Sequence, residues 1–131
     1  MGKYIEEMAV QMQRIPLPAD QGAQNLLTSA KSFASAIAGA ALGGGNPDQS
    51  KRTLEDMRTT ISLLASRIQS NPEAARVFKE HNILRILQVM HTIALGVQEG
   101  KPEPGEDEIN RLLHAVPDLL PPSKKWWQFW K

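Results

Sequence analysis

The chain has 131 residues, which is the usual length of a single domain. Its 15 basic and 14 acidic side chains nearly cancel, and this balance argues against a protein that binds nucleic-acid phosphate. The absence of cysteine excludes disulfides, thiol catalysis and cysteine-ligated zinc. It also fits a reducing compartment, so we expect a cytoplasmic protein with no nucleic-acid partner.

Hydrophobic residues recur at three- and four-residue steps along most of the chain, which predicts an all-α fold. The first stripe runs from Tyr4 to Ile15 and ends at Pro16, because proline cannot continue a helix. A second helix is expected from about Asp20 to Leu42. Its small residues repeat every four positions, at Ala30, Ala34 and Ala38. In lipid this spacing would indicate a dimer seam, but in this chain we expect tight packing inside a helical bundle.

The later helices begin at recognisable start sequences. Asn46-Pro47 and Asn71-Pro72 each combine a capping residue with a proline suited to a first helical turn. The helix from Ile83 to about Gln98 is apolar on most sides, which predicts a central position. A last amphipathic helix opens at Glu106 and closes at Pro117. We therefore predict a single bundle of five to six helices over residues 1–120, followed by a tail over residues 121–131.

The segment from Asn71 to Leu87 resembles the helix pair inside an armadillo repeat. The likeness covers this helix pair alone, lacks the glycine usual between the two helices, and has no second copy. Stacked repeats need about three units to bury a continuous core. The resemblance would imply a protein-binding role, but it carries no functional assignment here.

The sequence contains no pattern typical of an active site. Its three histidines, His81, His91 and His114, have no metal-ligand spacing, and we expect all three on the surface. The basic residues of the third helix are interrupted by acids, which indicates a solvated face; they are Lys51, Arg52, Arg58 and Arg67. We predict no catalytic, cofactor-binding or metal-ligating residue, and hence no enzyme.

The candidate binding segment is the C-terminal tail, which contains all three tryptophans of the chain. On a helix, its four aromatic rings would share an arc of about 160°, with the lysines on the opposite side. On a strand, the rings would divide between two faces. The predicted binding residues are Lys124, Lys125, Trp126, Trp127, Phe129, Trp130 and Lys131.

An aromatic face beside a basic face is typical of a helix that lies on a membrane surface. We therefore expect peripheral association with an anionic membrane, at its inner face, as the function of a helical adaptor module. Two alternatives stay open. The tail could dock into a groove on a partner protein, because aromatic residues dominate protein interfaces, or it could fold back over its own bundle. Formation of a homo-oligomer, which the sequence does not decide, would strengthen binding by presenting several tails.

Overall fold

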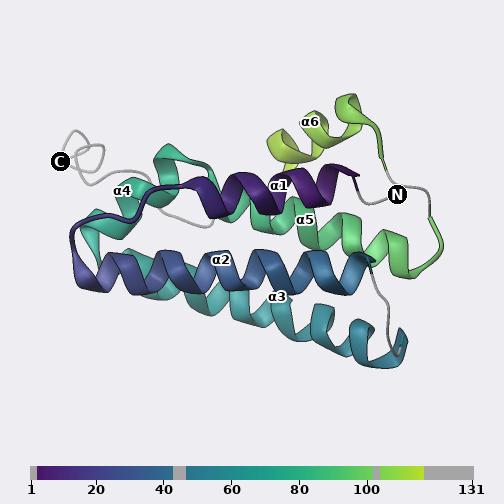
Figure 1. Cartoon of the computed structure of the whole chain (residues 1–131), viewed down its shortest axis with the longest axis horizontal. Coiled ribbons are helices and arrows are strands. Elements are labelled where there is room, and N and C mark those ends of the chain that lie inside the picture. Colours follow the sequence, from purple (N-terminus) through teal and green to yellow (C-terminus); the bar gives the residue numbers. More distant parts are fainter. Residues whose placement is uncertain (1–2, 43–46, 102–103, 117–131) are drawn as a thin grey trace, which may run out of the picture.

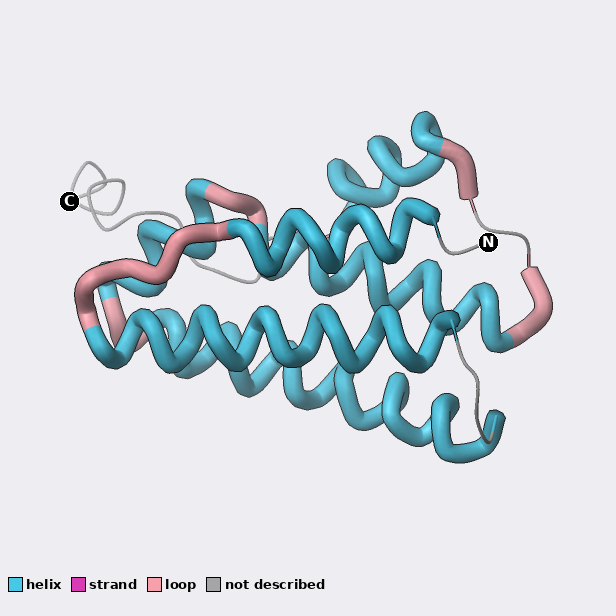
Figure 2. Tube along the Cα trace, in the orientation of Figure 1, coloured by secondary structure: helices cyan, strands magenta, loops and turns pink. Residues whose placement is uncertain are grey.

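The computed structural model describes residues 3–42, 47–101 and 104–116, and all of their regular structure is helical (Figures 1 and 2). The all-α prediction is confirmed. The helices are α1 (Lys3–Arg14), α2 (Gln21–Leu42), α3 (Pro47–Gln69), α4 (Pro72–Glu80), α5 (Ile83–Gln98) and α6 (Glu106–Ala115). Their bounds agree closely with the expected starts and stops, because prolines and capping residues act locally.

Four longer helices form the body of the bundle, with α1, α2, α3 and α5 lying side by side in alternating directions (Figure 1). The short helix α4 turns the chain from α3 into α5 at one end. The last helix, α6, runs back along the edge of the bundle and packs mainly on α5. None of the described helices combines the length and hydropathy that a membrane crossing requires.

The alanine stripe of α2 lies inside the bundle, as the sequence predicts. Ala30 and Ala34 are fully buried, and Ala38 is 8% exposed. Since α2 packs against α1, α3, α4 and α5, these small side chains let the neighbouring backbones approach closely. The stripe is therefore used within the chain, as part of its own core.

The central position predicted for α5 is also confirmed. This helix packs against each of the five other helices of the described chain. Leu87, Val89 and Met90 have no exposed surface. At its end, Gly100 adopts a φ of +83°, and the amide of Lys101 donates to the Gly96 carbonyl at 2.9 Å. This glycine ending satisfies carbonyls that the last helical turn would otherwise leave unpaired.

The turn between α4 and α5 depends on Asn82, which has a φ of 53°. It stands where a glycine would be expected between two such helices, because asparagine is among the few other residues that enter this left-handed region at low cost. The amide of Asn82 donates to the Lys79 carbonyl, and its own carbonyl accepts from Ile86. The residue thus closes α4 and opens α5 within one turn.

Candidate interaction surface

The seven predicted binding residues of the tail, Lys124, Lys125, Trp126, Trp127, Phe129, Trp130 and Lys131, lie outside the described residues. The described chain ends at Val116, a half-buried residue directly after α6. Val116 is therefore the described residue nearest to the tail in the sequence, and we describe the surface around it.

Val116 lines a surface notch of about 210 Å³ between α3 and α5. We call it the α3–α5 notch and define it by its described lining residues, Arg58, Ile61, Ser62, Gln88, His91, Thr92 and Val116. Helix periodicity explains the set: Arg58 and Ser62 are four positions apart on α3, and Gln88 and Thr92 are four apart on α5. Two polar pairs therefore face each other across the helix contact.

Arg58 supplies the positive charge of this notch. Its side chain is exposed and forms no hydrogen bond or ion pair with another described residue. Two hydroxyl groups also line the notch, Ser62 beside Arg58 on α3 and Thr92 opposite on α5. Among the described residues each donates within its own helix, Ser62 to the Arg58 carbonyl at 3.3 Å and Thr92 to the Gln88 carbonyl at 3.0 Å. These carbonyls already accept a backbone hydrogen bond within their helix. The hydroxyls can therefore rotate toward a ligand at little cost.

The prediction of a surface position is wrong for His91, which is only 7% exposed. Its Nε2 atom forms a hydrogen bond with the backbone carbonyl of Leu54 on α3. Because a carbonyl can only accept, Nε2 must carry the proton. The ring thus joins α5 to α3 at the base of the notch, a contact that sequence periodicity does not reveal because it depends on how the two helices pair.

The other two histidines are exposed, as predicted. His81 ends α4, and the Nδ1 atom of His114 contacts the Asn110 carbonyl one turn earlier in α6. No group of three or more metal-ligating side chains comes together among the described residues. The basic residues of α3 are exposed as expected, but one of them, Arg58, belongs to the notch.

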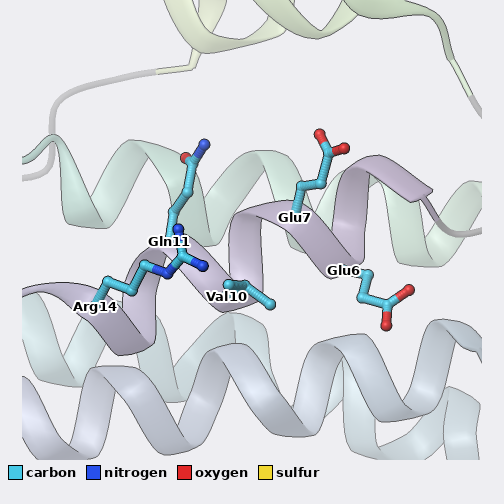
Figure 3. A pocket seen from close by; sticks show the side chains of 5 residues that line it. All are labelled: Glu6, Glu7, Val10, Gln11 and Arg14. Carbon is cyan, nitrogen blue, oxygen red and sulfur yellow. The ribbon is translucent and has the colours of Figure 1, made fainter.

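A second depression lies on the outer face of α1 (Figure 3). Its described lining consists of five α1 side chains, Glu6, Glu7, Val10, Gln11 and Arg14, which project from one helix. Val10, between Glu6 and Arg14 in this view, is 43% exposed. A single exposed valine among polar side chains is ordinary for a protein surface. This depression therefore identifies no ligand.

Comparisons with protein-family models, curated proteins and solved structures gave no match to this chain.

Proposed function

We propose that this protein is a non-enzymatic helical interaction module that associates peripherally with an anionic membrane surface through Lys124 to Lys131, while its bundle positions a partner. The observation that supports the proposal most strongly is the composition of that segment. All three tryptophans and one of the three phenylalanines of the chain occur within five positions, flanked by lysines. Their helical spacing separates an aromatic face from a basic face, the arrangement that suits the boundary between headgroups and acyl chains.

The energies expected for such a contact are moderate. Burying one large aromatic side chain removes about 150–250 Å² from water, worth at most about 4–6 kcal/mol at 25 cal/mol per Å². Rings at a membrane interface stay partly hydrated, so half of that value or less is realistic. Three lysines add about 1 kcal/mol each on an anionic leaflet, whereas ordering the backbone costs about 1–2 kcal/mol per residue. Binding should therefore be reversible and weakened by salt.

The tryptophans provide a direct test, because any tryptophan fluorescence of this protein comes from the segment itself. We expect the emission to shift to the blue with vesicles that contain anionic lipid, and the shift to diminish in high salt. The protein should sediment with these vesicles, and deletion of residues 123–131 should abolish sedimentation. Equal sedimentation with and without the segment would reject its role.

The alternative of a protein groove predicts a different pattern. It predicts that the protein does not bind vesicles. It also predicts that a defined partner is lost in a pull-down when Trp127 and Trp130 are replaced by alanine. A variant in which Phe33 of α2 becomes alanine provides a control, since it removes an aromatic side chain from the bundle and leaves the tail unchanged. Loss of the partner with the tail variant alone would favour this alternative over the membrane.

A further inference from the structure

We propose that the α3–α5 notch binds a phosphate group through the guanidinium of Arg58, and that in the membrane-associated protein this phosphate belongs to a lipid headgroup. The inference rests on the proposed function for its source of phosphate. It adds a second contact, on the folded bundle, to the contact made by the tail.

The chemistry of the notch favours an oxyanion. Arg58 has a planar set of N–H donors that matches phosphate, and these donors have no described protein partner. The Ser62 and Thr92 hydroxyls lie on the facing walls and can each donate one further bond. The volume of about 210 Å³ is that of several water molecules, enough space for a phosphate group.

The charges around the notch also favour an anion. No acidic side chain is among its described lining residues. Glu55, three positions before Arg58 on the same helix, forms no ion pair with it and does not line the notch. The positive charge of Arg58 therefore has no acidic partner among the described residues, and it favours an anion that enters the notch.

The position of the notch connects it with the tail. Val116 forms part of its wall, and Lys124 follows Val116 by eight positions in the sequence. A fully extended chain covers at most about 3.6 Å per residue, so at most about 29 Å of chain connects the two positions. A membrane surface that the tail contacts is therefore held close to the bundle, and Arg58 meets headgroups at a raised effective concentration.

The test compares vesicles of phosphatidic acid, whose phosphate monoester is terminal, with vesicles of phosphatidylserine at equal surface potential. We expect the full-length protein to partition about fivefold more strongly onto phosphatidic acid, because Arg58 can form paired bonds with the terminal phosphate. In Arg58→Gln this preference should fall to about one. Arg58→Lys should lose it as well while keeping the charge, since an ammonium lacks the planar fork.

Arg67→Gln is the matched control, because it removes the same charge from an exposed position of α3 outside the notch. It should weaken binding to both vesicles slightly and leave their ratio unchanged. Equal ratios in the original protein, Arg58→Gln and Arg67→Gln would overturn the phosphate site. If tryptophan emission still shifted to the blue in that case, the proposed membrane association would stand without it.

A second measurement uses inorganic phosphate and does not depend on the tail. Titration with phosphate at constant ionic strength should shift the NMR signals of Arg58 Nε–H and of the Ser62 and Thr92 amides, and the shifts should vanish in Arg58→Gln. Phosphate shifts without vesicle binding would identify a site for free phosphate and reject the lipid source. No shift at these signals, together with equal vesicle ratios, would reject the proposal as a whole.

Discussion

The side-chain amide of Asn71 donates a hydrogen bond to the Asp20 carboxylate at 3.0 Å, across 51 positions of sequence. Each residue also caps a helix. The same Asp20 oxygen accepts from the Ala23 amide at the start of α2, and Asn71 Oδ1 accepts from the Ala74 amide at the start of α4. One hydrogen bond therefore joins two helix N-termini and holds the start of α4 against the start of α2.

Replacing Asn71 by alanine should lower the free energy of unfolding by about 1–2 kcal/mol, because the variant loses both a helix cap and the bond to Asp20. Urea denaturation followed by circular dichroism measures the change. Asn110→Ala serves as the control, since Asn110 is exposed within α6 and its side chain has no hydrogen bond to a described residue. A loss as large in the control would contradict the specific role of Asn71.

Gly22 lies beside the hydrogen bond between Asn71 and Asp20 and leaves room for the Asn71 side chain. A Cβ atom added there would lie 2.9 Å from Asn71 Nδ2, so Gly22→Ala should break the bond between Asn71 and Asp20. The same change favours the helix by about 0.5–1 kcal/mol, and the two effects should nearly cancel in the original protein. In the Asn71→Ala background the clash with Asn71 is absent and only the approach to Asp20 Oδ2 at 3.3 Å remains, so Gly22→Ala should be more favourable there than in the original protein. A double-mutant cycle measures this coupling, and additive effects would disprove it.

The contact between Asn71 and Asp20, together with one between Arg76 and Glu73, makes the stability of the fold depend on pH. The hydrogen bond from Asn71, followed by that from the Ala23 amide, lowers the pKa of Asp20 below its ordinary value of 3.8. The hydrogen bond from Arg76 likewise lowers the pKa of Glu73 below 4.5. The folded state then binds fewer protons than the unfolded state, so this stabilisation is complete above these ordinary values and is lost as pH falls through the lowered ones.

We expect the thermal midpoint of the original protein to fall more steeply below pH 3.8 than that of Asp20→Asn, which keeps a capping oxygen but no longer titrates at this position. Asp56→Asn removes an exposed carboxylate that has no described side-chain partner, and it serves as the control. If Asp20→Asn followed the same pH profile as the original protein, the linkage would be incorrect.

The left-handed conformation of Asn82 predicts an unusual order of substitutions. Asn82→Gly should leave stability nearly unchanged, whereas Asn82→Ala should cost about 1 kcal/mol, because alanine has a Cβ atom without the short polar side chain that lets asparagine adopt a φ of 53°. This order is the reverse of helix propensity. Urea midpoints of the two variants decide it, and an alanine variant at least as stable as the glycine variant would contradict the conformation.

The contact between His91 and the Leu54 carbonyl predicts a single tautomer. Since the carbonyl accepts, the neutral ring should carry its proton on Nε2 at neutral pH. Long-range ¹H–¹⁵N correlation spectra distinguish the two ring nitrogens. The exposed residue His81 should show a mixture of tautomers and is an internal reference. A proton found on Nδ1 of His91 would show that α3 and α5 do not meet as described.

Much of the fold follows from local rules. Prolines and caps set the helix bounds. Apolar residues at steps of three and four along α3 indicate a core seam over Leu54, Met57, Ile61, Leu64 and Ile68; Met57 is half-buried and the other four are buried. The tail assignment is equally local, and it stays a prediction because residues 117–131 are outside the described structure. The notch could not be foreseen in the same way. From the sequence, Arg58 is one of several solvated basic residues on α3. Only the packing of α5 beside α3 makes it part of a notch.

The amino-acid order by itself determined where helices begin and end, which faces are apolar, and where the aromatic residues are concentrated, because each property depends on neighbours within about one or two turns. Tertiary structure alone decided that His91 is buried against α3, that Asp20 meets Asn71, and that Arg58 faces Thr92 across a notch. These relationships join residues far apart in sequence. They depend on the relative rotation and register of packed helices, which the periodicity of a single helix does not specify.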